Sequence, residues 1–399
     1  MRKLLTALSI AVLTVSTASS AEITNQEILQ KLQELEAKLK KLEVENKRLR
    51  ELLEEKGSTL IAARKKTKKL KVTGRVLFRF SQTADIDESG GKSIYGDPGN
   101  GFTVRKARVR FHGKLNDNVS YMIHLRADRG SQVELWDAYV KYSFDSIPLS
   151  IKMGQFKVPL SMSYLKSGTE LWFPERPVAV NKIAPVWRDV GLEATWKVSR
   201  ALKLSASVLN GEGWSSDKIY NSDKKYAYVF SADVTPVDNE SLRWRVRVGY
   251  EVGTDAYSKL IYTKYDAVSV ERRLLDVETR LDLRSFGLSL EGGFLYDNPQ
   301  DAVDSSGSSV QLGDAKGYYL QADYALPSVK GLHLVGRYSW LDPNDDVDDK
   351  YDVDYTSLGF YYLINGWQAA IRSAYIFANE RHGEEVDNDL FVTEFQLLF

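Results

Sequence analysis

The segment VRKARVRFHGKL, residues 104–115, carries basic side chains at every second position. The basic row consists of Lys106, Arg108, Arg110, His112 and Lys114. The alternate positions are apolar or small, namely Ala107, Val109, Phe111, Gly113 and Leu115. Successive side chains of a β-strand point to opposite faces, so this pattern predicts a strand with one basic and one apolar face. A guanidinium group is always charged and presents a planar fork that suits phosphate or carboxylate, so the basic face could bind anions.

Other alternating segments also carry arginines opposite their apolar side chains. The further residues predicted to bind anions along a shared channel are Arg75, Arg79, Arg126, Arg243, Arg245 and Arg247. Stacked along a pore, such groups attract anions and pass them between sites. The alternative interpretation is that these charges only hydrate the wall and pair with one another. It has support, because Asp276, Glu278 and Asp282 share the face of Arg280.

A long proline-containing connection, residues 157–188, adds a second group of cations. Its basic residues are Lys157, Lys166, Arg176, Lys182 and Arg188, against the acidic Glu170 and Glu175. Its position between the fifth and sixth predicted strands favours a loop that folds inward as a constriction. A surface loop is the alternative.

Catalytic and metal-binding patterns are weak in this chain. The acidic segment at 342–354 starts with calcium-loop spacing, but Val347 and Val353 stand where an EF-hand needs Gly and Glu. No cysteine is present to form a disulfide or a thiolate metal site. His112 and His124 have no evident Ser or Asp to complete a triad. We therefore expect no enzyme, no metal and no cofactor.

The elements that position the basic rows are predicted strands, beginning near residue 70. About sixteen segments of ~10 residues alternate apolar and polar side chains, which is the length of a tilted membrane strand. Their connections alternate between short turns and long loops, as in outer-membrane barrels. The fold prediction is all-β: a 16-stranded antiparallel transmembrane β-barrel preceded by an α-helical coiled coil. Apolar faces would contact outer-membrane lipid, and basic faces would line the lumen.

The first 70 residues differ from the rest of the chain. Residues 1–21 resemble a signal peptide, with Arg2 and Lys3 before an apolar stretch too short to span a membrane. Residues 22–57 carry a heptad seam and are predicted to form a periplasmic coiled coil, which implies an oligomer without fixing its subunit number. The seam is Ile28, Leu32, Leu35, Leu39, Leu42, Asn46, Leu49 and Leu53. At ~1.5 Å per residue the coil could reach toward the cell wall.

Residues 58–70 form a basic linker, and residues 71–399 form the predicted barrel pore. The linker's basic run is either solvated or in contact with lipid head groups or another polyanion. The terminal segment FVTEFQLLF ends in Phe399 on its apolar face, which resembles the signal read by the barrel-assembly machinery. Lys plus Arg and Asp plus Glu number 54 each, so the balanced charge argues against a nucleic-acid partner.

The segments RKARVRFHGKL, ELWDAYVKYSF, KMGQFKVPLSMSYL and ELWFPERP resemble the phosphate-selective porin O/P family. The resemblance covers residues 70–399 and implies a trimeric, 16-stranded outer-membrane porin with an inward third loop. Arg105 and Lys106 match the family's paired basic residues. By alternation we expect Lys106 in the lumen and Arg105 facing outward.

The function predicted from these patterns is passive diffusion of small anions, with phosphate and polyphosphate as candidate solutes. The alternatives are a general porin for small hydrophilic solutes, a cation-preferring porin, a sugar porin and a barrel enzyme.

Overall fold

The computed structural model describes residues 30, 33–49, 51–52, 70–83, 100–128, 132–184, 188–213, 221, 224–255, 261–383 and 387–399. The chain divides into two compact units, Met1–Lys68 and Lys69–Phe399. The predicted signal peptide and residues 58–69 of the predicted linker lie outside the described residues.

The larger unit contains sixteen long strands. The first eight are β1 Leu70–Thr83, β2 Gly101–Lys114, β3 Val119–Arg126, β4 Glu134–Ser143, β5 Leu149–Phe156, β6 Asp189–Lys197, β7 Leu202–Leu209 and β8 Ala227–Asp238. The others are β9 Leu242–Asp255, β10 Ser269–Leu283, β11 Leu288–Val303, β13 Ala315–Ala325, β14 Leu332–Asp342, β15 Val353–Leu363, β16 Ala369–Glu380 and β17 Leu390–Leu398. The two-residue β12, Ser309–Val310, pairs with the end of β11.

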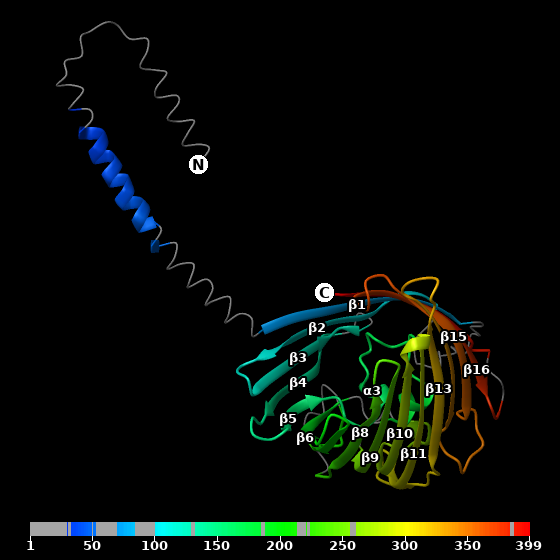
Figure 1. Cartoon of the computed structure of the whole chain (residues 1–399). Coiled ribbons are helices and arrows are strands. Elements are labelled where there is room, and N and C mark those ends of the chain that lie inside the picture. Colours follow the sequence, from blue (N-terminus) through cyan, green and yellow to red (C-terminus); the bar gives the residue numbers. More distant parts are fainter. Residues whose placement is uncertain are drawn as a thin grey trace. The chain divides into compact units, whose positions relative to one another are not determined.

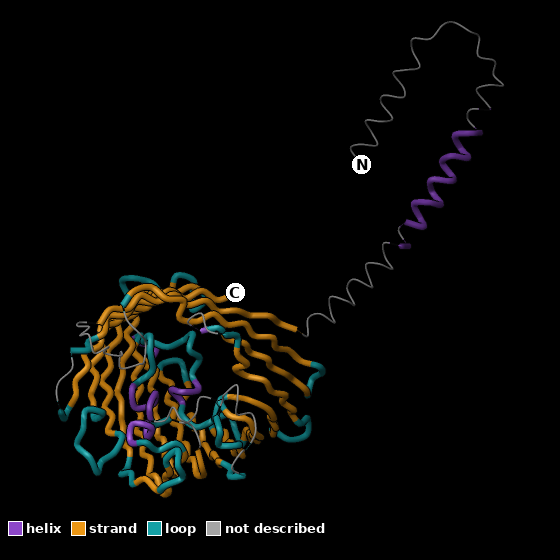
Figure 2. The backbone as a smooth tube through the Cα atoms, turned by 180° about the vertical axis from the view of Figure 1, so that it is seen from behind, coloured by secondary structure: helices purple, strands orange, loops and turns teal. Residues whose placement is uncertain are grey.

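The strands close into a barrel (Figures 1 and 2). Each long strand pairs antiparallel with its sequence neighbours, and β1 pairs with both β2 and β17. The pairing of β1 with β17 runs from Arg75↔Leu398 to Thr83↔Leu390. It closes the ring, so no free sheet edge remains along this pairing. The predicted 16-stranded antiparallel barrel is therefore confirmed.

Short connections join β2 to β3, β4 to β5, β6 to β7 and the later hairpins of the same parity. The turn between β10 and β11 is the 3-10 helix η3, Arg284–Phe286, which ends at Gly287 with a positive φ of 61°. Among the long loops, the one between β9 and β10 contains η2, Ile261–Tyr265. The longest, between β5 and β6, contains two short helices, α3 Met162–Leu165 and α4 Val178–Lys182.

Side chains alternate between an apolar outer face and a polar inner face. Large outward side chains such as Phe78, Met153 and Phe230 remain exposed, whereas the inward Arg79 and Glu394 are buried. Aromatic pairs lie on the outer surface, including Tyr142 with Phe144 at 4.9 Å between ring centroids. An apolar outer wall with aromatic residues is the arrangement expected of a membrane barrel.

The smaller unit is helical over residues 33–49 and 51–52. Leu35, Leu39, Leu42 and Leu49 on this helix are each more than half exposed. An exposed leucine seam is what one strand of a coiled coil presents when its partner helices are absent, so the coil stays a prediction. Within the described part of the chain, no helix combines the length and the apolar character needed to cross a membrane.

Candidate functional site

The described part of the β5–β6 loop, residues 157–184 and 188, lies inside the barrel, where its helices are visible against the inner wall (Figure 2). Its first helix, α3, is capped at its N-terminus by Ser161, whose hydroxyl accepts a hydrogen bond from the Tyr164 amide at 3.0 Å. α4 packs on β11, β13 and β14, and Ala179 lies so close to Gly317 that no side chain fits there. We call this segment the inward loop.

Arginines from four strands donate hydrogen bonds to backbone carbonyls of the inward loop. Arg247 Nε on β9 donates to Leu160 O at 2.5 Å, and Arg272 Nη2 on β10 donates to Ile183 O at 2.6 Å. The other two are Arg337 Nη1 on β14, to Glu175 O at 2.8 Å, and Arg372 Nη1 on β16, to Leu171 O at 3.1 Å. A charged donor satisfies these buried carbonyls strongly, so the wall holds the loop in one position.

Only Arg247 of these four arginines was among the predicted site residues. Arg272, Arg337 and Arg372 share the inward parity of their strands, so alternation could have placed them in the lumen. Nothing in a single sequence indicates that their partners are loop carbonyls.

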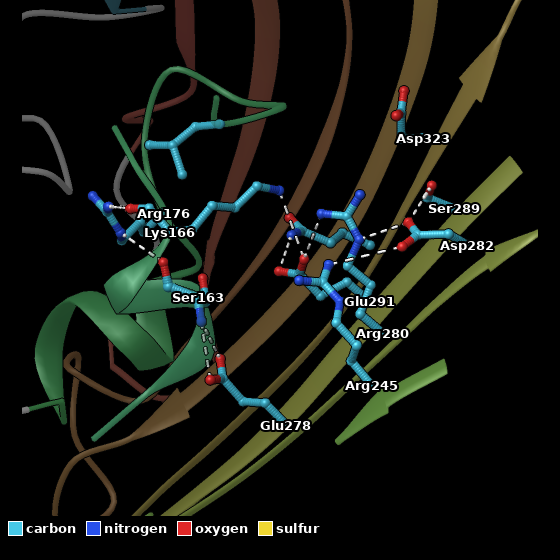
Figure 3. A network of polar contacts seen from close by, with 12 residues as sticks. Ser163, Lys166, Arg176, Arg245, Glu278, Arg280, Asp282, Ser289, Glu291 and Asp323 are labelled. Atoms are coloured by element: carbon cyan, nitrogen blue, oxygen red, sulfur yellow. Dashed lines mark hydrogen bonds and ion pairs between the residues drawn. The ribbon is translucent and has the colours of Figure 1, made fainter. Parts of the chain in front are cut away.

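A second polar network joins the inward loop to β10 and β11 (Figure 3). Glu278 accepts hydrogen bonds from the Ser161 hydroxyl at 3.0 Å and the Ser163 amide at 3.0 Å. Lys166 Nζ lies 3.7 Å from Glu291 Oε2 and 4.1 Å from the ring centre of Trp172. Burial lowers the pKa of Lys166 to about 8, although the Glu291 carboxylate acts in the opposite direction.

Arg105 faces the lumen, so the outward placement predicted from alternation is wrong. Leu77 pairs with Lys106 and Phe78 pairs with Val104, which leaves Arg105 as the extra residue of a β-bulge. A bulge interrupts the alternation and turns the inserted side chain. Arg105 Nη2 lies 3.1 Å from Glu175 Oε1 of the inward loop.

Glu175 lies among several wall cations. Its Oε1 is 2.5 Å from Arg79 Nη2, and Arg79 also pairs with Glu394 at 2.6 Å. Burial alone would raise the pKa of Glu175, but the charges of Arg79 and Arg105 hold it well below its usual range. Glu175 is therefore an anion inside a basic cluster, which we call the constriction cluster.

In and beside the constriction cluster, the inner wall contains cations whose donors remain unused among the described residues. Arg75 Nε and Nη2 are buried without an acceptor, and Lys106 forms no hydrogen bond to another described side chain. Arg110, which pairs in register with Thr73 and His124, likewise has no carboxylate partner in the described part of the wall. These three predicted residues are wall cations without a carboxylate ion pair among the described residues.

Arg108 and Arg126 are paired rather than free. Arg108 forms an ion pair with Asp128, and Arg126 Nε lies 2.6 Å from Glu134 Oε2. The Arg126 guanidinium stacks on Trp136 at 3.6 Å, and Arg188 stacks on the same ring at 4.1 Å. Sequence analysis missed Trp136 because a second bulge, between His124 and Leu125 on the paired strand, disturbs the alternation of β4.

The remaining predicted residues of the inward loop and of β2 differ in whether they have a hydrogen-bond or ion-pair partner. Lys157 Nζ donates to Tyr164 O at 3.0 Å and Arg176 Nε donates to Ser163 O at 3.0 Å, so both stabilise the inward loop itself. Arg188 Nε pairs with Asp137 Oδ1 at 3.0 Å. Lys182 lies on α4, and Lys114 is exposed at the end of β2.

The β9 arginines have nearby carboxylates. Arg243 Nε lies 3.4 Å from Asp238, Arg245 Nη2 lies 3.8 Å from Asp282, and Arg247 Nη1 lies 2.6 Å from Asp233.

Four lysines that were not predicted also face the lumen, on β4 to β7. They form two directly opposed pairs, Lys141↔Lys152 and Lys197↔Lys203. Lys152 Nζ lies 2.5 Å from Glu193 Oε2, and Lys203 Nζ lies 2.7 Å from Asp233 Oδ2. Their inward parity was readable from the sequence, but their cross-strand opposition required the register.

No group of three or more His, Cys, Asp or Glu side chains within the described residues is arranged to hold a metal ion. In the acidic β14–β15 loop, Asn344 and Asp345 instead accept hydrogen bonds from the Gly313 and Asp314 amides, at 2.8 and 2.7 Å.

Comparison with known proteins identifies a family and a fold. A family model described as phosphate-selective porin O and P matches residues 82–281. No curated protein sequence matches the chain. The outer membrane channel DcaP of Acinetobacter baumannii is 12% identical, with a TM-score of 0.57 over 83% of this chain and 97% of that one.

Two other solved structures share the fold at similarly low identity. OprB of Pseudomonas putida is 12% identical, with a TM-score of 0.58 over 84% of this chain and 95% of its own. An anion-selective porin from Comamonas acidovorans is 10% identical, with a TM-score of 0.55 over 83% of this chain and 99% of its own. At such identities the likeness establishes the fold alone.

Proposed function

The chain belongs to the phosphate-selective porin O and P family and is an outer-membrane porin, and from that premise we propose that it passes small anions, phosphate among them, by passive diffusion. No catalytic step is part of this proposal. The family and the barrel make the protein a channel, and the charge of the lumen determines what the channel prefers.

Like-charged residues placed directly opposite one another carry the proposal. Arg75↔Arg108, Arg108↔Arg126, Lys141↔Lys152 and Lys197↔Lys203 are cross-strand pairs on the inner wall. Directly opposed like charges destabilise a sheet, and here they are repeated along β1 to β7. Nearby carboxylates such as Asp128 and Glu193 offset part of this repulsion. An anion moving past the pairs relieves the rest, so a row of them favours anions along the wall.

Phosphate and carboxylate are the solutes that the unused donors fit best. Arg75 and Arg110 offer planar guanidinium groups, which bind oxyanions through paired hydrogen bonds, and Lys106 adds a point charge.

A general porin for small hydrophilic solutes is the second candidate function. The observation that favours it is the number of lumen cations with a carboxylate close by, among them Arg126 with Glu134 and Arg247 with Asp233. Paired charges hydrate a wall without a strong preference for one ion. The two functions differ in the ratio of chloride to potassium permeability.

We further propose that the porin is a homotrimer whose N-terminal helices form a periplasmic coiled coil. The exposed leucines of residues 33–49 and the heptad seam support this arrangement. The proposal includes a signal peptide at residues 1–21, assembly through Phe399 by the barrel-assembly machinery, and contact between the coil and the cell wall.

The double variant Arg108→Glu and Arg110→Glu tests the proposed anion preference. Each substitution changes the wall by two formal charges on the lumen side of β2. In single-channel recordings across a KCl gradient, the reversal potential should move toward potassium, and inorganic phosphate should block chloride current less well.

Arg200→Glu on the exposed β6–β7 turn is the control, because it makes the same change of two formal charges per substitution outside the lumen. A double variant whose reversal potential equals that of the control would count against anion preference set by this wall.

A further inference from the structure

We infer that Glu175 is a tethered internal anion of the constriction cluster, and that an entering oxyanion is bound by displacing the Glu175 carboxylate. This inference rests on the proposed function and concerns how the same site is regulated. Glu175 would thus set the solute concentration at which an oxyanion binds, whereas the surrounding cations attract the solute.

Glu175 makes the contacts that a bound oxyanion would make. Its Oε1 accepts from Arg79 Nη2 at 2.5 Å and from Arg105 Nη2 at 3.1 Å, which are guanidinium groups of two adjacent strands. The charge of Lys106 also acts on this carboxylate. Charge-assisted contacts to a carboxylate have the same geometry as those to phosphate, so the two anions compete for one set of donors.

The cluster carries more positive charge than Glu175 neutralises. Its described ionisable side chains are Arg75, Arg79, Arg105, Lys106, Arg372, Glu175 and Glu394. Five cations minus two carboxylates leave a formal excess of three positive charges. Arg75 Nε and Nη2 are buried without an acceptor among the described residues. A buried cationic excess with unused donors favours a ligand with more than one negative charge.

The backbone of Glu175 is held independently of its side chain. Its carbonyl accepts from Arg337 Nη1 at 2.8 Å, and the Arg337 guanidinium lies 4.4 Å from the ring centre of the neighbouring Phe173. The carboxylate can therefore leave its position by side-chain rotation while the inward loop remains on the wall. Displacement then needs no opening of the constriction.

Competition with a fixed carboxylate selects among solutes. Chloride offers one charge and no paired oxygens, so it replaces Glu175 poorly. An oxyanion with more than one negative charge and several acceptor oxygens, such as inorganic phosphate, can engage Arg79 and Arg105 at the same time, next to the charge of Lys106. The site is thus filled by Glu175 when phosphate is scarce and by phosphate when it is abundant.

Block of chloride current by inorganic phosphate tests this inference in the intact porin. Replacing Glu175 by Gln removes the internal competitor, so the half-blocking phosphate concentration should fall about tenfold or more, the range expected for losing a charged hydrogen-bond competitor. Glu170→Gln is the matched control, because Glu170 belongs to the same loop and is exposed. In that variant, the half-blocking phosphate concentration should equal that of the wild type.

Glu175→Asp serves if the Gln variant fails to assemble. Its shorter side chain reaches the two guanidinium groups less well, so the half-blocking concentration should fall by a smaller factor. An unchanged or increased half-blocking concentration in the variant that assembles, or no phosphate block in any channel, would overturn the inference.

The wild-type reversal potential separates this inference from the proposed function. A wild-type channel that prefers potassium contradicts the proposed function, whatever the Glu175 variants do. The internal-anion inference alone is contradicted if the wild-type channel prefers chloride and the Glu175 variants have the same half-blocking phosphate concentration as the wild type.

Discussion

Lys166 is an inward-loop cation whose charge depends on pH within an accessible range. Burial lowers its pKa to about 8, so it carries a positive charge below that pH and loses the charge above it. The lumen therefore becomes less positive as pH rises through about 8. We expect the preference for chloride over potassium to decrease across this range, measured by reversal potentials at a series of pH values.

Lys166→Met isolates this effect, because it removes the titrating group and keeps a side chain of similar length. The variant should show a lower preference for chloride at neutral pH and no step near pH 8. A step of the same size in both channels would assign the titration to another group.

Arg105 lies inward because of the bulge, so its charge should influence permeation. Arg105→Glu should move the reversal potential toward potassium by an amount similar to Lys106→Glu, because the two side chains share the constriction cluster. Recordings of both variants beside Arg200→Glu provide the comparison. If Arg105→Glu matched the turn control instead, the side chain would face away from the pore, as simple alternation predicts.

At the scale of strands, alternation alone predicted the number of strands, their antiparallel order and the inward parity of residues such as Arg79 and Arg247. These follow from the two-residue period of a strand and from the need to satisfy backbone groups in lipid. It failed at Arg105 and missed Trp136, because a bulge inserts one residue without a clear sequence signal.

The contacts of the inward loop were beyond sequence reasoning for a different reason. Its arginine and carboxylate partners lie far away in the sequence, as with Arg337 and the Glu175 carbonyl, which are 162 residues apart. Such pairing depends on the three-dimensional position of the loop and not on local periodicity. Lys157 and Arg176 were predicted as constriction charges, yet they donate to the loop's own carbonyls.

The junction of β1 and β17 gives a prediction about barrel closure. Phe399 exchanges backbone hydrogen bonds with Gly74 at 2.7 and 3.1 Å, and a Cβ at Gly74 would lie 2.1 Å from the Phe399 ring. Gly74→Val should displace this ring and cost about 1–3 kcal/mol, as overpacking does. The fraction of heat-modifiable folded barrel in outer-membrane preparations should decrease.

Gly336→Val on β14 is the control for that measurement, because the nearest atom to its Cβ position is 3.8 Å away. Equal folded fractions for the two variants would mean that the contact between Phe399 and Gly74 does not limit assembly.

The heptad seam gives a second prediction at this scale. A peptide of residues 24–56 should be helical in a concentration-dependent manner, and Leu39→Lys with Leu42→Lys should make it monomeric and largely unfolded by circular dichroism. Lys40→Gln with Lys41→Gln, outside the seam, should preserve the oligomer. A wild-type peptide that stayed monomeric at high concentration would contradict the coiled coil.

At the scale of the whole molecule, a chain with no net charge can present a wall rich in cations along β1 to β7 because its charges are sorted. Inward cations line β1 to β7, whereas acidic residues such as Asp345 and Asp348 lie in the β14–β15 loop. Within the barrel, carboxylates such as Glu278 and Glu291 are buried beside the inward loop. Selectivity therefore depends on where charges lie rather than on their sum.

The reversal potential of the wild-type channel in a KCl gradient tests this account most directly. The opposed arginine and lysine pairs predict that chloride carries more current than potassium, and that adding phosphate reduces the chloride current. A reversal potential that shows potassium to be the more permeant ion would mean that the carboxylates of the lumen and loops dominate, and would contradict the proposed anion channel.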